Sequence, residues 1–162
     1  MSTTLTPPAA ELVNVASVVI GTLHIPRQEL IDFPTGVFGF PEAHTWALLP
    51  TPREGLYWLQ STDYSALAFL LVDPFLSFPG RYQIDVAPTE LARLRTPSSQ
   101  DVLVLAIVTM PSQLGEPCTA NLQAPVLFNL HDRQACQSIR SDDGYSVREK
   151  FDIDQFARTT AS

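Results

Sequence analysis

The sequence predicts a mainly β protein that forms a single small antiparallel β-barrel-like domain, with about ten short strands and one short helix. Short apolar runs alternate with turns rich in proline, glycine, asparagine and aspartate, a pattern typical of a closed barrel or a sandwich. The 14 prolines fall mainly between these runs, as expected for strand edges and loops. A length of 162 residues favours one domain over several.

We expect three parts along the chain. Residues 1–14 contain Thr, Pro and Ala without a clear period and are predicted to form a flexible leader. Residues 15–151 hold the apolar runs and are predicted to form the barrel domain. Residues 152–162 end in a small, polar stretch, so we expect a C-terminal tail that frays.

Each apolar run predicts one strand. In chain order, the predicted strands are 15–23, 30–33, 45–49, 56–61, 66–72, 82–86, 102–110, 126–130, 135–140 and 145–148. The runs 66–72 and 102–110 are predicted to be central strands, because in the longer one both alternating faces are apolar. The one predicted helix, 88–95, begins with proline and spaces Leu91 and Leu94 for burial on one side.

Two glycines occur in the segment FPTGVFGF at 33–40. Gly36 and Gly39 lack the following Lys-Ser or Lys-Thr of a phosphate-binding loop. We therefore interpret them as backbone devices that allow a positive φ or a close approach of chains. Three aromatic residues are expected to cover this turn: Phe33, Phe38 and Phe40.

Two further segments have a predicted backbone role. Asp73, Pro74 and Phe75 follow a buried strand and predict a turn, because Asp accepts backbone hydrogen bonds and proline fixes φ. The stretch 121–129 begins and ends with asparagines that can bridge loops. Pro125 within it predicts an edge or bulged strand, whose free backbone groups a partner could use.

Composition and motif content favour a binding protein over an enzyme. The formal charge of −7 opposes binding to nucleic acid or to an anionic membrane. No catalytic or nucleotide-binding motif is found, and the three histidines are isolated, so we expect no metal, no cofactor and no catalytic residues. No apolar stretch approaches the ~20 residues of a membrane span, and no secretory signal is evident, so we expect a cytoplasmic protein. Cys118 and Cys136 are expected to be packed thiols.

Acidic residues concentrate near the C-terminus, with few cations between them. They are Asp142, Asp143, Glu149, Asp152 and Asp154. The pattern fits either a solvated acidic face or a surface that binds a basic protein. Calcium-loop spacing and its central glycine are missing.

Several stretches, in this order, resemble the FliW family of flagellar assembly factors, and together they cover about residues 16–151. They are DFPTGVFGFPE at 32–42, LQS at 59–61, LAFLLVDPFLSFPGRYQIDV at 67–86, VLAIVT at 104–109, TANLQAPVLFN at 119–129, and the pair Gln137 and Tyr145. The DPF and NLQAP segments are the most specific. As structural motif residues the resemblance marks Phe33, Gly36, Gly39, Phe40, Asp73, Pro74, Phe75, Pro125, Gln137 and Tyr145.

The resemblance implies a single barrel-like domain with two protein partners. One is CsrA, a small basic RNA-binding dimer that represses translation of flagellin messenger RNA, and the other is flagellin. FliW-like proteins antagonise CsrA, and flagellin sequesters them in a partner-switching feedback loop. We expect the free protein to be a monomer. The contact with CsrA is expected either at the acidic residues Asp142, Asp143, Asp152 and Asp154, or at the edge between Asn121 and Asn129.

Two other interpretations are open at this point. A flavin-binding split-barrel oxidoreductase suits the all-β pattern, although no basic cluster is visible to hold the flavin phosphate. A nucleic-acid-binding barrel needs a positive groove with stacking aromatics, and the ten Lys and Arg residues are dispersed.

Overall fold

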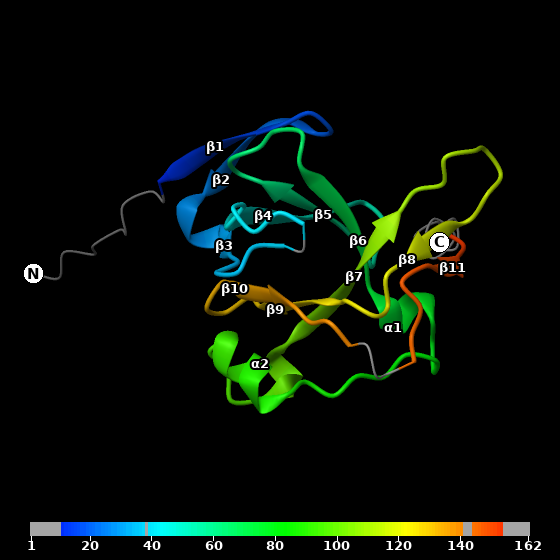
Figure 1. The fold of residues 1–162 in the computed structure, drawn as a ribbon. Helices are drawn as coiled ribbons and strands as arrows, with labels where there is room; N and C mark the ends of the chain where they lie inside the picture. Colours follow the sequence, from blue (N-terminus) through cyan, green and yellow to red (C-terminus); the bar gives the residue numbers. More distant parts are fainter. Residues whose placement is uncertain (1–10, 38, 141–143, 154–162) are drawn as a thin grey trace, which may run out of the picture.

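The structure, a computed structural model, describes residues 11–37, 39–140 and 144–153. In these ranges it contains eleven strands, two short α-helices and two 3-10 helices (Figure 1). The strands are β1 (Leu12–Ser17), β2 (Gly21–Pro26), β3 (Ile31–Asp32), β4 (Thr45–Pro50), β5 (Leu56–Ser61), β6 (Ala68–Val72), β7 (Leu103–Thr109), β8 (Cys118–Ala120), β9 (Val126–Asn129), β10 (Gln134–Gln137) and β11 (Glu149–Phe151). The helices are η1 (Arg27–Glu29), α1 (Pro74–Ser77), α2 (Pro88–Arg93) and η2 (Ser99–Asp101).

Seven strands close into a barrel, which confirms the predicted fold class. The order β7-β6-β5-β4-β3-β10-β9 returns to its start because β9 also pairs with β7, for example Leu105 opposite Val126. Every pairing around the barrel is antiparallel except the one between β10 and β3, where Gln134 lies opposite Asp32. A sandwich is excluded by this closure.

Residues from all seven barrel strands fill the interior. Because side chains alternate along a strand, each strand sends every second residue inward. The fully or almost fully buried inward residues are Ile31, Trp46, Leu59, Leu71, Leu105, Val126, Phe128 and Ala135. Phe33, just after β3, completes this core with edge-to-face contacts to Trp46 and Phe128, both with ring centroids 5.9 Å apart.

A second core lies on the outer face of β6, β7 and β9. Val104, Ala106 and Val108 of β7 point away from the barrel interior and are buried against Phe78 and Leu94, at the ends of α1 and α2. The prediction that both faces of the run 102–110 are buried is therefore confirmed. β8 and β11 extend the sheet beyond the barrel, and their buried residues Cys118, Ala120 and Phe151 belong to this outer core.

The hairpin β1–β2 forms a separate two-stranded sheet outside the barrel. Val15 and Ile25 pack against Ala47 on the outer side of β4. The predicted strand 15–23 was wrong as one element, because Ser17 Oγ accepts hydrogen bonds from the Val19 and Ile20 amides (3.2 and 3.0 Å) and turns the chain. β1 begins at Leu12, inside the stretch predicted as a leader.

Two predicted strands are absent from the described structure, and one side chain joins the two segments. Neither 82–86 nor 145–148 is a strand; instead the Tyr145 hydroxyl accepts from the Gln83 amide (2.9 Å) and donates to its carbonyl (3.0 Å). The backbone of Gln83 thus finds its partners in a side chain and not in a sheet ladder. The Tyr82 hydroxyl donates to the Leu122 carbonyl at 2.9 Å.

The segment after β6 forms a helix where a turn was predicted. Asp73 accepts from the amides of Phe75 (2.9 Å) and Leu76 (3.4 Å), as the sequence indicated. These bonds cap α1, in which Pro74 occupies the first turn, so the predicted turn continues into one helical turn. The helix predicted at 88–95 is confirmed as α2, and Leu94 is fully buried.

The predicted edge strand near Pro125 is an interior strand. Pro125 lies just before β9, which pairs with β10 on one side and β7 on the other, and all four β9 residues are buried. Proline is tolerated because it precedes the ladder. β9 therefore offers no free edge for strand addition by a partner.

Leu105 tests the barrel interior, since its side chain is fully buried. We expect Leu105→Ala to lower the free energy of unfolding by about 2–5 kcal/mol through lost burial and a cavity. Leu114→Ala is the matched control, because Leu114 is fully exposed (104%), and it should change stability by less than about 0.5 kcal/mol. Urea unfolding measures both; equal effects would contradict the assignment of the core.

Candidate protein-binding surfaces

The structure places only part of the predicted acidic face. Asp142, Asp143 and Asp154 lie outside the described residues. Asp152 is exposed and directly follows β11, and Glu149 in that strand pairs with Arg81 at 2.9 Å. The acidic face therefore stays a prediction.

The other predicted contact residues have structural partners inside the protein. Asn121 Oδ1 accepts from the amides of Gln123 (3.1 Å) and Ala124 (3.0 Å). Asn129 is buried, and its Nδ2 donates to the Leu94 carbonyl at 2.7 Å. Both asparagines thus hold loops, as their chemistry suggested. Gln137 acts similarly, since its Nε2 donates to the Ala124 carbonyl at 3.1 Å.

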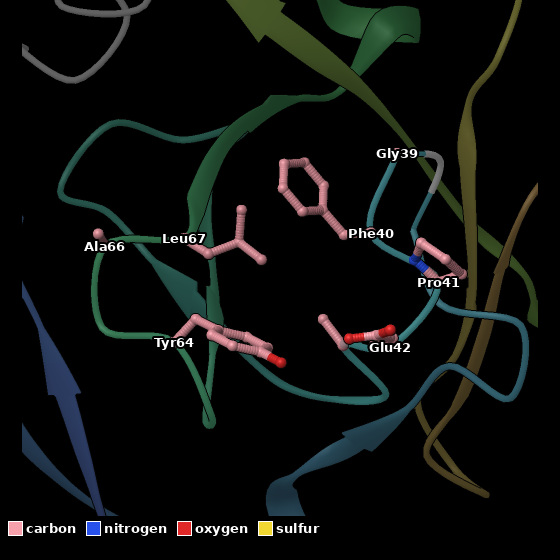
Figure 2. Close-up of a pocket in the computed structure, with 8 residues that line it drawn as sticks. Gly39, Phe40, Pro41, Glu42, Tyr64, Ala66 and Leu67 are labelled. Carbon is pink, nitrogen blue, oxygen red and sulfur yellow. The ribbon is translucent and has the colours of Figure 1, made fainter.

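An apolar hollow of about 690 Å³ lies between two segments that are distant in the sequence. We call it the rim hollow. It is lined by Gly39, Phe40, Pro41, Glu42, Ala43, Tyr64, Ala66 and Leu67. Figure 2 shows the side chains of Phe40, Leu67 and Tyr64 directed toward the same space. The sequence did not indicate this site, because its two walls are far apart along the chain and come together only in the folded structure.

The first wall is the glycine segment that follows β3. Gly36 has φ +69° and Gly39 φ +89°, which confirms that both serve backbone conformation. A Cβ on Gly36 would lie 2.5 Å from the Phe40 carbonyl oxygen and 2.6 Å from the Pro41 Cα, so only glycine fits. This tight loop holds Phe40 at the rim, where its ring contacts Phe69 at a centroid distance of 5.9 Å.

The second wall is the loop 62–67 between β5 and β6. The buried Gln60 points its Nε2 at four carbonyl oxygens, those of Ser61 (3.0 Å), Tyr64 (3.2 Å), Ser65 (3.3 Å) and Leu67 (3.3 Å). The Ser61 hydroxyl accepts from the amides of Asp63 and Tyr64 at 3.2 and 3.1 Å. One side chain from a barrel strand thus fixes the course of the whole loop.

The chemistry of the rim hollow is that of a binding surface. Phe40 and Tyr64 remain 41% and 48% exposed, so aromatic area is open to solvent at its mouth. Glu42 is the one charged residue in its lining. Such a surface suits an apolar group with a neighbouring cation.

Within residues 11–37, 39–140 and 144–153, no group of three or more His, Cys, Asp or Glu side chains could hold a metal ion. Among the same residues no helix has the length and apolar character to cross a membrane. Cys118 and Cys136 are both buried, as predicted, and the Cys118 thiol donates to the Met110 sulfur at 3.7 Å. Burial, and then the nearby Glu90 carboxylate, raise the pKa of the Cys136 thiol from 9.0 to about 11, against a smaller opposite effect of Arg93.

The two glycines of the first wall make a matched pair. Gly39→Ala should cost about 1–2 kcal/mol, because a left-handed conformation disfavours alanine and nothing lies within 4 Å of the added Cβ. Gly36→Ala should cost at least about 1 kcal/mol more, because the backbone of Phe40 and Pro41 must also move. Thermal and urea unfolding measure the difference. Equal costs would show that the loop yields without strain.

The Cys136 thiol should make stability fall at alkaline pH. Its pKa is raised in the folded state, so the unfolded chain loses the proton first and is favoured as pH rises from about 9 to about 11. Cys136→Val should flatten this part of the curve of unfolding free energy against pH. Cys118→Val is the control, and an equal flattening by both variants would contradict the assignment to Cys136.

Comparison with known proteins gives one consistent family. The family model described as "FliW protein" matches residues 14–151. A flagellar assembly factor FliW of Treponema denticola is 36% identical over 129 residues, covering 80% of this chain and 86% of that protein. One of Geobacillus thermodenitrificans is 32% identical over 145 residues, covering 90% and 99%.

A solved structure agrees. The crystal structure of a flagellar assembly factor FliW superposes with a TM-score of 0.79 at 32% identity, covering 85% of this chain and 96% of that one. This agreement extends the sequence match to the arrangement of the barrel. The chain belongs to the FliW family of flagellar assembly factors.

Proposed function

We propose that this chain is a protein-binding regulator of flagellum assembly that binds CsrA and antagonises its repression of flagellin messenger RNA. It also binds flagellin, so that the two partners compete for it in a feedback loop. The observation that carries the proposal is the family match over residues 14–151, with relatives named flagellar assembly factors. The partners themselves come from the resemblance of the sequence to that family.

The charge of the chain supports a basic partner. With a formal charge of −7, the protein attracts a basic RNA-binding dimer and repels RNA phosphates. Bound beside the RNA surface of CsrA, it would weaken RNA binding even without covering the site, alone or with a change of shape in CsrA. Both partners are made in the cytoplasm, where we place the protein.

We propose a role in binding and not in catalysis. The flavin-binding alternative needs a cationic cluster for the flavin phosphate. In the rim hollow, the charged residue of the described lining is the carboxylate Glu42. Its remaining lining is apolar or aromatic, which is suited to contact with a protein.

The acidic residues Asp142, Asp143, Asp152 and Asp154 are proposed to steer the encounter with CsrA. Exposed ion pairs contribute only about 0.2–1 kcal/mol each, so apolar contacts must supply most of the affinity. Long-range attraction between a negative and a positive surface acts mainly on the association rate. A separate apolar contact is therefore needed to supply the affinity that the acidic residues do not.

Surface plasmon resonance with immobilised CsrA tests the steering. Changing the four aspartates to Asn should slow association roughly threefold to tenfold with little change in dissociation, and raising salt should slow association of the unaltered protein. A charge-matched control changes Glu29, Asp32, Glu54 and Asp101, all exposed, to Gln or Asn. Equal slowing by both sets would show that only net charge matters. Failure of the unaltered protein to bind either CsrA or flagellin would contradict the proposed function.

A further inference from the structure

We infer that the rim hollow is a docking site for an apolar segment of a protein partner whose flanks carry Lys or Arg. The inference rests on the proposed function in supposing that the chain acts by binding a protein. It assigns a surface and a chemistry of recognition to that binding.

The openness of the rim hollow favours a protein segment over an enclosed small molecule. Small-ligand pockets bury most of their ligand and so hide their aromatic walls. Here Phe40 and Tyr64 stay 41% and 48% exposed although both face the hollow (Figure 2). A side chain inserted between these rings, with its backbone lying across the mouth, would cover both.

The charges around the rim hollow favour a partner segment with Lys or Arg on either side of its apolar part. The segments 39–44 and 62–67, which hold its two walls, contain Glu42 and Asp63 and no Lys or Arg. Both carboxylate residues are exposed. They repel an anionic membrane surface and attract a cation placed next to an apolar anchor. The formal net charge of the whole chain, −7, also attracts a cation.

The apolar surface continues beyond the hollow onto the β1–β2 hairpin. The Val18 amide donates to the Ser65 carbonyl at 2.9 Å, which joins the hairpin turn to the loop of the second wall. Figure 1 shows the tip of this hairpin beside that loop. Three side chains of the turn are exposed: Val18 at 72%, Val19 at 54% and Ile20 at 38%. Exposed apolar side chains gathered in this way mark interaction surfaces.

Both walls are held in place before any partner arrives. Gly36 permits the turn that fixes Phe40, and Gln60 anchors the loop that carries Tyr64 and Leu67. A prearranged site loses little conformational entropy on binding. Phe40 is also supported by the barrel, since the Phe69 ring lies 5.9 Å from the Phe40 ring and 5.8 Å from the ring of the buried Trp46, between centroids.

Two matched pairs of variants test the site. Phe40→Ser removes an aromatic side chain that is 41% exposed and contacts one ring; Phe75→Ser removes one that is 43% exposed and also contacts one ring, on α1 away from the hollow. Glu42→Lys reverses the charge at the hollow, and Glu54→Lys reverses an exposed charge at the β4–β5 turn. Circular dichroism melting checks that each variant folds.

The first measurement uses CsrA and flagellin from the same organism. Phe40→Ser and Glu42→Lys should each weaken binding of at least one partner tenfold or more, while Phe75→Ser and Glu54→Lys should change it less than twofold. If the unaltered protein binds a partner and Phe40→Ser and Phe75→Ser change that binding equally, the inference is overturned while the proposed function is still supported.

The second measurement does not depend on the identity of the partner. Labelled 15-residue peptides carry a central Leu-Phe-Leu anchor with either Lys or Glu flanks, and fluorescence anisotropy follows their binding to the full chain. The Lys-flanked peptide should bind at least tenfold more tightly, and Phe40→Ser should abolish the difference. Equal binding of the two peptides would overturn the inference. So would a dimer of the unaltered protein, seen in light scattering, that Phe40→Ser converts to a monomer, because the hollow would then bind a second copy of the chain.

Discussion

The pairing of β7 with β9 is the contact on which the rest of the structure depends. Leu103, Val104 and Leu105 lie opposite Phe128, Leu127 and Val126, and this short ladder turns an open sheet into a barrel. Closure places each of the seven barrel strands between two neighbours, although β3 pairs with β10 only where Gln134 lies opposite Asp32. Outside this ring lie the loops, the β1–β2 hairpin and the extension formed by β8 and β11.

At three places outside the ladders, a polar side chain supplies hydrogen bonds to backbone groups. Gln60 gathers the carbonyls of the loop after β5, and Tyr145 pairs with both backbone groups of Gln83. Asn129 links the end of β9 to the end of α2 through the Leu94 carbonyl. Gln60 and Asn129 thus fix irregular segments to barrel strands, and Tyr145 fixes two irregular segments to each other.

The sequence was sufficient for features that depend on local pattern. The run 102–110 was recognisable as central because both of its faces are apolar, and the two faces do enter two different cores. The positive φ angles of Gly36 and Gly39 followed from glycine chemistry in a turn. The sequence did not predict the local structure where the hydrogen bonds of a single side chain differ from the apolar pattern. Ser17 turns an apolar run into a hairpin, and the Tyr145 hydroxyl bonds both backbone groups of Gln83 in a segment that was predicted as a strand. The rim hollow could not be predicted from the sequence, because residues near 40 and near 65 come together only in the folded barrel.

The attachment of the β1–β2 hairpin has a consequence for local stability. It belongs to a separate sheet, and its contact with the barrel centres on three buried residues, Val15, Ile25 and Ala47. Because this contact is small, we expect the hairpin to open at a lower free energy than the barrel, whose strands pair in a closed ring. Its opening would break the bond from Val18 to Ser65, while the hydrogen bonds from Gln60 would still hold the loop 62–67. Amide protons of β1 and β2 would then exchange with solvent while those of β5 and β7 stay protected, so the molecule carries a fast-opening part beside a slow one.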